Sequence, residues 1–195
     1  FIDELKLSMF SYDQFKFEQT YSRILSEMSF REAFSDVFIP LLEFVGVQWL
    51  SDNITTSHEH FVTSLIMQKL MINIERVQSV RPDKRKAYVL FLPDNEIHEL
   101  GLMYVNYELS RSGYQTIYLG PSVPIDSLES IISCYSSISF VSYFTVYPTK
   151  SEVNTYLSEI DDKILSSYNL SLNLLGRNAQ EVSFKSDRIK VFNKV

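Results

Sequence analysis

The sequence predicts an α/β protein with an all-α N-terminal part. The N-terminal part is expected to be a bundle of the four-helix type, and a doubly wound parallel sheet is expected to follow it. Residues 1–80 hold one proline and one glycine and keep a helical spacing of apolar residues. From residue 87 onward, short apolar runs alternate with amphipathic runs of about ten residues. We therefore expect a helical bundle over 1–80, a linker over the polar and basic segment 81–86, and an α/β domain over 87–195.

Three helical stretches with capping signals lie within residues 1–80. The second of them is expected to be kinked or split at Pro40, which has no backbone N–H to donate. Three or four packed helices of this kind form a small bundle. Candidate N-caps are Ser11 or Asp13 for the first helix, Ser29 with Glu32 in a capping box for the second, and Thr55, Thr56 or Ser57 for the third.

The second half of the chain alternates strands and helices, which predicts right-handed crossovers and a parallel sheet. Ligands of such sheets bind outside the carboxyl ends of the strands. We therefore expect the loops 94–101, 142–148 and 176–178 to meet at one edge, with 120–124 beside them. The expected strands are 87–92, 115–119, 138–144, 170–175 and a short 189–192; the expected helices are 100–110, which Gly113 ends, 125–135 and 151–163.

Composition narrows the classes of function. The net charge is −6 and no basic cluster is longer than 81–86, so we do not expect this segment to bind nucleic acid by itself. The single cysteine, Cys134, excludes an internal disulfide and fits a reducing compartment, from which we expect a cytoplasmic protein. No apolar run is expected to reach the length needed to span a bilayer. Phe1 in place of a start methionine suggests a fragment of a longer protein.

The loop after the first expected strand carries a candidate metal ligand. His98 is one of three histidines, and Glu96 stands two residues before it. A carboxylate in that place can hold one ring nitrogen and so fix the tautomer of a metal-binding histidine. A solvent-exposed histidine beside ordinary loop acids fits the same residues, and the residues alone leave both interpretations open.

The other two histidines, His58 and His60, begin the third helix. Residues two apart on a helix point about 200° from each other, so these two cannot easily share one metal. Trp49, the only tryptophan, ends the preceding helix and is expected at the same end of the bundle as Glu59 and His60. A tryptophan packed against polar residues of a helix start is the alternative interpretation.

Two motifs resemble known cobalamin proteins. The pattern Glu96-x-His98-x-x-Gly101 is similar to the cobalamin-binding signature of methionine synthase-type corrinoid domains, and the segment 142–144 stands where that family has S-x-L. Trp49, nine intervening residues and then 59–60 resemble the W-x9-E-H pattern of CarH-like photoreceptors. These photoreceptors are the cobalamin-dependent branch of MerR-type transcriptional regulators. The chain thus resembles their C-terminal effector domain, whose sheet is flavodoxin-like or Rossmann-like.

The resemblance implies roles for single residues. His98 would be the lower axial ligand of cobalt in place of the cofactor's own dimethylbenzimidazole, and Glu96 would hold its far ring nitrogen. Trp49 would cover the upper face, Glu59 would contact the adenosyl group, and His60 would take the upper cobalt position after illumination. Further contacts with cobalamin, most of them along its nucleotide tail, are expected at Gly101, Gly120, Ser142, Phe144, Gly176 and Arg177.

The same resemblance implies a switch and not an enzyme. Vitamin B12, as adenosylcobalamin, would control homo-oligomerisation, and an N-terminal DNA-binding domain outside this chain would respond. Two departures motivate an alternative: Gly176-Arg177 replaces the usual Gly-Gly pair, and Phe144 replaces a smaller residue. In this alternative the chain keeps the architecture, binds no cobalamin, and serves as a dimerisation or other-ligand domain. A second alternative is a corrinoid carrier of a methyltransferase, in which His98 holds a methylated cobalt.

Overall fold

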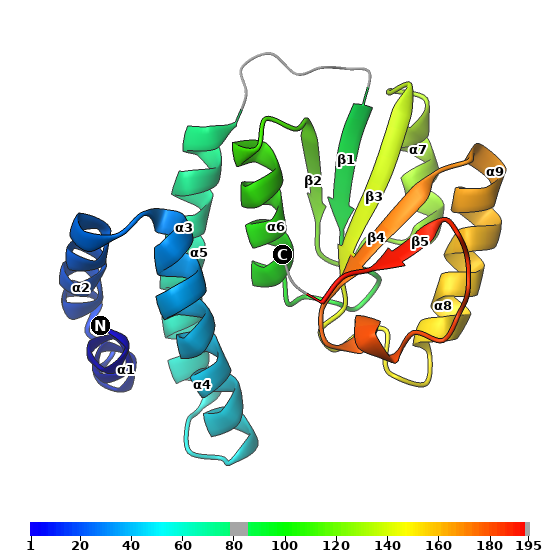
Figure 1. The fold of residues 1–195 in the computed structure, drawn as a ribbon. Helices are drawn as coiled ribbons and strands as arrows, with labels where there is room; N and C mark the ends of the chain where they lie inside the picture. The colour runs from blue at the N-terminus through cyan, green and yellow to red at the C-terminus, as the bar shows by residue number, and fades with distance from the viewer. Residues whose placement is uncertain (79–85, 194–195) are drawn as a thin grey trace. The chain divides into compact units, whose positions relative to one another are not determined.

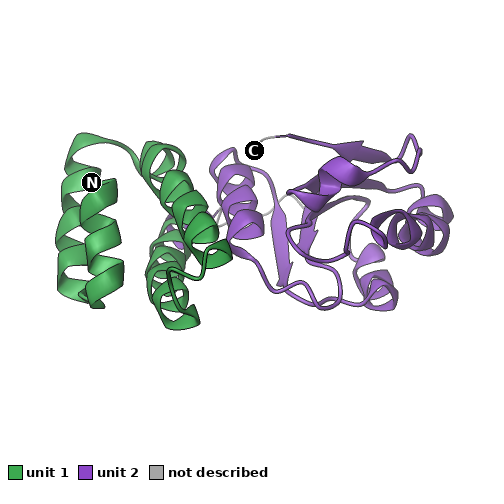
Figure 2. Ribbon diagram, turned by 90° about the horizontal axis from the view of Figure 1, so that it is seen from below, with its two compact units in different colours: residues 1–73 green, residues 74–195 purple. Residues whose placement is uncertain are grey.

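The computed structural model describes residues 1–78 and 86–193. The chain consists of two compact units, Phe1–Asn73 and Ile74–Val195, which Figure 2 colours separately. The first unit is helical and the second holds a parallel sheet (Figure 1). Most of the expected linker, 81–85, lies outside the described residues, and Lys86 is the first residue of strand β1.

The first unit begins with two helices, α1 (Ile2–Ser11) and α2 (Gln14–Glu27). Tyr12 ends α1 in the left-handed conformation, with φ of 52°. The carboxylate of Asp13 accepts the backbone N–H of Lys16 at 2.9 Å. Of the two candidate caps, Asp13 is therefore the one that begins the second helix.

A longer helical run follows, made of α3 (Phe30–Ala33), a π-helical turn η1 (Phe34–Phe38) and α4 (Ile39–Leu50). The predicted capping box at its start is confirmed. The expected break at Pro40 takes the form of the wider π turn directly before it, because proline offers no N–H and a helix absorbs that loss by a local change of pairing.

The run 30–50 is long and apolar enough to cross a membrane by length and composition, so the expectation that no run reaches that length is wrong. Its buried residues recur every three or four positions, as in Phe34, Phe38, Leu41 and Val45. This one-sided pattern is typical of a helix that packs against a bundle. Helix α5 (Thr56–Val77) completes the unit, and Phe17 and Tyr21 of α2 stack on Phe38.

The sheet of the second unit has the strand order β2-β1-β3-β4-β5, and each neighbouring pair is parallel. This is the predicted doubly wound, flavodoxin-like arrangement. Each expected strand boundary lies within one residue of the observed one, because a buried apolar run bounded by polar residues is a clear signal. The strands are β1 (Lys86–Phe91), β2 (Thr116–Gly120), β3 (Ser137–Tyr143), β4 (Ser171–Leu175) and β5 (Ile189–Val191).

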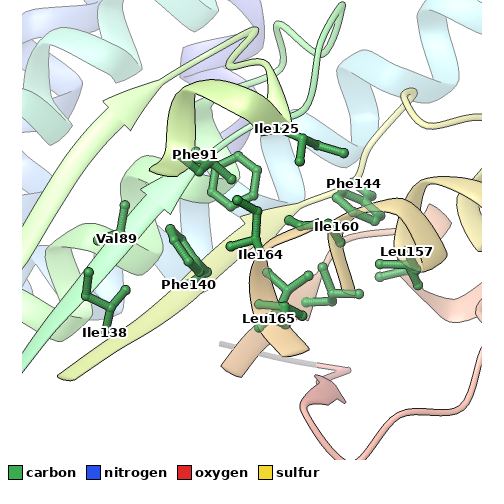
Figure 3. Packing of buried hydrophobic residues seen from close by; sticks show 14 of the residues in the cluster. Val89, Phe91, Ile125, Ile138, Phe140, Phe144, Leu157, Ile160, Ile164 and Leu165 are labelled. Carbon is green, nitrogen blue, oxygen red and sulfur yellow. The ribbon is translucent and has the colours of Figure 1, made fainter. Parts of the chain in front are cut away.

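Helices cover both faces of the sheet. Helix α6 (Leu100–Arg111) packs its Leu102 and Val105 on Leu90 and Val141. The opposite face holds a larger cluster of buried hydrophobic residues, part of which, Phe140 among them, is drawn in Figure 3. The elements that cover this face are η2 (Ile125–Leu128), α7 (Glu129–Ile132), α8 (Val153–Ile160), the π turn η3 (Asp161–Leu165) and α9 (Ser166–Tyr168); η4 (Asn178–Glu181) follows β4.

One expected helix is shorter than predicted. Over 125–135 the chain forms a 3₁₀ turn and then a single α-helical turn that ends at Ile132. The residues after it include three serines within 133–137, which are poor helix formers in an interior position.

The strand order places a topological switch point between β1 and β3. The chain leaves β1 toward β2 on one side, whereas β3 pairs with β1 on the other side (Figure 1). Loops that leave two such strands diverge and form the usual ligand-binding crevice of an open α/β sheet. The loop with His98 follows β1 directly.

Candidate functional site

A buried carboxylate joins the two loops at the switch point. Glu96 is fully buried, and its Oε1 accepts the backbone N–H of His98 at 2.9 Å. Its Oε2 accepts three consecutive backbone N–H groups of the loop after β3, from Thr145 at 3.1 Å, Val146 at 2.6 Å and Tyr147 at 2.8 Å. The loop after β1 is thereby fixed to the loop after β3.

The hydrogen bonds decide the charge of Glu96. Burial by itself raises the pKa of this carboxyl group. The hydrogen bonds from the His98 ring and from the N–H groups of Val146, His98 and Tyr147 outweigh burial and lower the pKa to about 2. The side chain is therefore ionised near neutral pH, and both of its oxygens act as acceptors.

This carboxylate fixes the tautomer of His98. Its Oε1 lies 2.6 Å from His98 Nδ1. Because an ionised carboxylate can only accept, Nδ1 of His98 carries a proton, and in the neutral form of the ring the lone pair is therefore on Nε2. The His98 side chain is about half exposed, at 47%. The expected contact between Glu96 and the histidine ring is thus present, in the tautomer that binds a metal through Nε2.

The loops expected to meet at the carboxyl edge do meet. Asn95 donates its backbone N–H to Ser122 Oγ at 3.2 Å, and the Ser122 N–H donates to the Glu96 carbonyl at 3.2 Å. The side chain of Asn178, from the loop after β4, donates to two carbonyls of the segment 146–148 at 2.9 Å each. Sequence reasoning did not single out Asn178, which carries no motif signal.

Two of the expected cofactor glycines are required by packing within the chain. A Cβ atom on Gly101 would lie 2.7–2.9 Å from ring atoms of Tyr143, so the ring rests on the bare backbone of α6. Gly176 has φ of 97°, and a Cβ atom there would lie 2.4 Å from the carbonyl oxygen of Phe144. Gly120 likewise has a positive φ of 85°, and its carbonyl accepts the N–H of Leu92.

Phe144 and Arg177, which depart from the family pattern, and Ser142, which fits it, lie in different surroundings. Phe144 is fully buried in the cluster of Figure 3, where its ring meets Tyr156 edge-on with centroids 5.7 Å apart. Arg177 is exposed and precedes η4. Ser142 is buried, and its hydroxyl donates to the Phe91 carbonyl at 2.8 Å. Phe144 therefore fills space inside the sheet–helix core.

Tyr156 is a neighbour of this site that sequence reasoning missed. Its hydroxyl is buried and has no hydrogen-bond partner within residues 1–78 and 86–193. Burial, followed by the negative charges of Asp94 and Glu159, raises its pKa. Tyr156 lies in the amphipathic helix α8, where a tyrosine is ordinary, so no sequence pattern marked it as a candidate site residue.

In the helical unit, the expected cofactor-binding residues Trp49, Glu59 and His60 lie on either side of the loop between α4 and α5. Trp49, in the last turn of α4, is 44% exposed. Glu59 is partly buried and His60 is exposed, both in the first turns of α5. His58 stacks on Tyr12 with ring centroids 4.8 Å apart, so this histidine has a packing role.

Comparison with known proteins agrees with these observations. Residues 1–72 match the family model of a B12 binding domain. The chain is 29% identical over 118 residues to the HTH-type transcriptional repressor CarH of Myxococcus xanthus. The aligned segment covers 60% of this chain and 38% of the repressor. It is 31% identical over 99 residues to the repressor CarA of the same organism, covering 50% and 32% of the two chains. The matches thus span about a third of these relatives.

The fold is also similar to that of the monomethylamine corrinoid protein of Methanosarcina barkeri, with a TM-score of 0.68 and 11% identity over 99% of this chain and 92% of the other. Residues 1–72 are thus similar to a B12 binding domain, and the whole chain has a fold similar to that of a corrinoid protein. In sequence, the chain is similar to part of the two transcriptional repressors CarH and CarA. The resemblance inferred from the motifs is confirmed.

Proposed function

We propose that this chain is the cobalamin-binding sensor domain of a transcriptional regulator, and that His98 is the lower axial ligand of cobalt. The observation that carries the proposal is the 2.6 Å hydrogen bond between His98 Nδ1 and the ionised Glu96. That bond holds the proton on Nδ1 and so directs the lone pair to Nε2. The match to a B12 binding domain and the similarity to CarH and CarA support the same cofactor.

The residues present fit this cofactor chemically. Cobalamin would supply a cobalt ion that can take a nitrogen ligand from the protein. A single neutral imidazole, offered by His98 from a partly exposed loop, suits such a metal. The Glu96 carboxylate increases the basicity of the imidazole by hydrogen bonding to its far nitrogen.

The helical unit has proposed roles that derive from the resemblance. We assign Trp49, Glu59 and His60 to the upper face of the cofactor, with His60 as a ligand of cobalt after illumination. The exposure of Trp49 and His60 supports this assignment, because a side chain engaged in the bundle core would not reach a ligand. The preferred cofactor in this proposal is adenosylcobalamin.

The biological role follows from the relatives. We propose that the domain acts as a switch without enzymatic activity, that it forms a homo-oligomer, and that it acts in the cytoplasm. DNA would be bound by an N-terminal domain outside this chain, since the matched part covers 38% of CarH and 32% of CarA.

One observation favours a second candidate function. Phe144 stands where the resemblance places the nucleotide tail, and it is fully buried in the core. A side chain in that place favours a family member that binds no cobalamin and serves as a dimerisation or other-ligand domain.

A binding experiment decides between the two candidates. The purified chain is mixed with adenosylcobalamin in the dark, desalted, and its visible spectrum is recorded. A red fraction that elutes with the protein supports the sensor, whereas a colourless protein rejects it in favour of the second candidate. The variant Phe144→Leu, which vacates part of the proposed tail space, should retain at least as much cofactor as the wild type.

A further inference from the structure

We propose that Glu96 is a positioning residue that holds the His98 loop and the loop after β3 in one arrangement, and that this task requires glutamate and not aspartate. The geometry of the two loops carries this inference in the protein without any ligand. Only its last readout, which measures corrinoid binding, rests on the proposed function.

The carboxylate divides its two oxygens between the two loops. Oε1 takes the backbone N–H and the ring Nδ1 of His98, at 2.9 and 2.6 Å. Oε2 takes the three N–H groups of 145–147, at 3.1, 2.6 and 2.8 Å. Consecutive N–H groups that converge on one point form an anion-binding concavity of the backbone. Glu96 fills this concavity from the neighbouring loop.

The main chain of Glu96 is itself anchored. Its N–H donates to the carbonyl of Pro93 at 3.0 Å, and its carbonyl accepts the N–H of Ser122 at 3.2 Å. These two hydrogen bonds oppose the backbone shift that a shorter side chain would require. Aspartate is shorter by one C–C bond, about 1.5 Å, and can serve one set of N–H groups at a time.

Local geometry predicts which set aspartate would keep. Asp side chains readily bond the N–H two residues further along the chain, as in an Asx-turn. Asp at position 96 would therefore retain His98 and release the three N–H groups of 145–147. Buried N–H groups without a partner are costly, so the loop after β3 would open to water.

The consequence is that the loop after β3 belongs to the His98 site. A movement of the imidazole is transmitted through one rigid carboxylate to residues 145–147, which lead into α8. The amide of Asn178 fastens the far side of the same loop through the carbonyls of Val146 and Pro148.

The test uses two variants with opposite expectations, E96D and E96Q, and E99Q as the matched control. Glu99 lies in the same loop and accepts the Tyr118 hydroxyl at 2.9 Å, a bond that glutamine can also accept. The readouts are NMR hydrogen exchange of the amides 145–147 and the ¹⁵N shifts of the His98 ring near neutral pH. E96D should exchange these amides roughly ten- to a hundredfold faster and keep the Nδ1–H tautomer.

E96Q should give the complementary result. Its carbonyl can accept from 145–147, whereas its NH₂ group faces His98 Nδ1 and can only donate. The ring proton should therefore move to Nε2, while exchange at 145–147 changes less than in E96D. E99Q should match the wild type in both readouts. Adenosylcobalamin affinity should fall roughly tenfold or more in E96D and in E96Q.

Distinct outcomes would overturn the inference. Exchange at 145–147 in E96D within about twofold of the wild type would show that Glu96 does not hold that loop. An unchanged His98 tautomer in E96Q would show that the carboxylate does not position the ring. If neither variant folds, fast exchange of these amides in the wild type would overturn the inference. Absence of corrinoid binding by the wild type rejects the proposed function and leaves the NMR outcomes decisive for this one.

Discussion

The side chain of Glu96 shows how the surroundings of one residue reverse the effect of burial. A fully buried carboxyl group ordinarily favours its neutral form. Here five N–H groups, two at Oε1 and three at Oε2, stabilise the charge. The resulting carboxylate dictates which nitrogen of His98 carries the proton, so the chemistry of the partly exposed histidine depends on a fully buried residue.

Replacing His98 tests its role as a ligand. In His98→Ala the protein should bind adenosylcobalamin at least about tenfold more weakly, or hold it with its own base still coordinated, because the axial imidazole is gone. The visible spectrum and the retained fraction after desalting measure both effects. Ile97→Ala, at a neighbouring side chain that is 68% exposed, is the control and should behave as wild type. A wild-type spectrum in His98→Ala would rule out His98 as the ligand.

Acid should destabilise the protein through Glu96. Its pKa is about 2 in the folded state against an ordinary 4.5, so the unfolded chain takes up the proton first as the pH falls. The contribution is complete above pH 4.5 and is lost progressively as the pH falls to 2. Its total is about 3 kcal/mol.

Urea unfolding at pH 6 and pH 3, followed by circular dichroism, measures this contribution. Wild type should lose more unfolding free energy than E96Q between the two pH values, because glutamine does not titrate. Other acids with lowered pKa values, such as Asp161 beside Arg188, contribute equally to both proteins. Equal losses in wild type and E96Q would contradict the low pKa of Glu96.

At the scale of elements, the first turn of α6 is shaped by the strand beneath it. The Tyr143 ring occupies the space that a side chain on Gly101 would need. Glycine in the first turn of a helix is otherwise a poor choice, since it costs backbone entropy. The close approach of β3 and α6 therefore explains a motif residue by packing.

Gly101→Ala should destabilise the α/β unit by about 1–3 kcal/mol, because the new methyl group would overlap the Tyr143 ring. Gly46→Ala is the matched control, since a Cβ atom at Gly46 in α4 meets nothing within 4 Å. That control should stabilise its helix by about 0.5–1 kcal/mol. Melting temperatures report both changes. A Gly101→Ala protein as stable as wild type would mean that the ring is free to move aside.

At the scale of the whole molecule, two compact units share one chain. The proposed sensor would convert a change at its cofactor into a change in association. The part of the chain that matches CarH covers 38% of that repressor. The proposed DNA-binding output of the switch is therefore expected outside the matched part.

Illumination should change the oligomeric state of the adenosylcobalamin-loaded protein. Size-exclusion chromatography with light scattering, in the dark and after green light, measures the mass. His60→Ala should bind the cofactor in the dark as wild type does but fail to keep the illuminated state, because the proposed upper ligand is missing. An unchanged mass in the wild type would reject the light-driven sensor and favour the corrinoid carrier.

The sequence by itself determined what depends on neighbours along the chain. Strand positions follow from apolar runs, the capping box of Ser29 and Glu32 from a spacing of three, and the Glu96–His98 contact from a spacing of two. Tertiary structure alone decided what depends on segments far apart in sequence. It brought the N–H groups of 145–147 to Glu96, laid Tyr143 on Gly101 and buried Phe144 in the core. These contacts depend on how strands pair and helices pack, and no local pattern encodes that pairing.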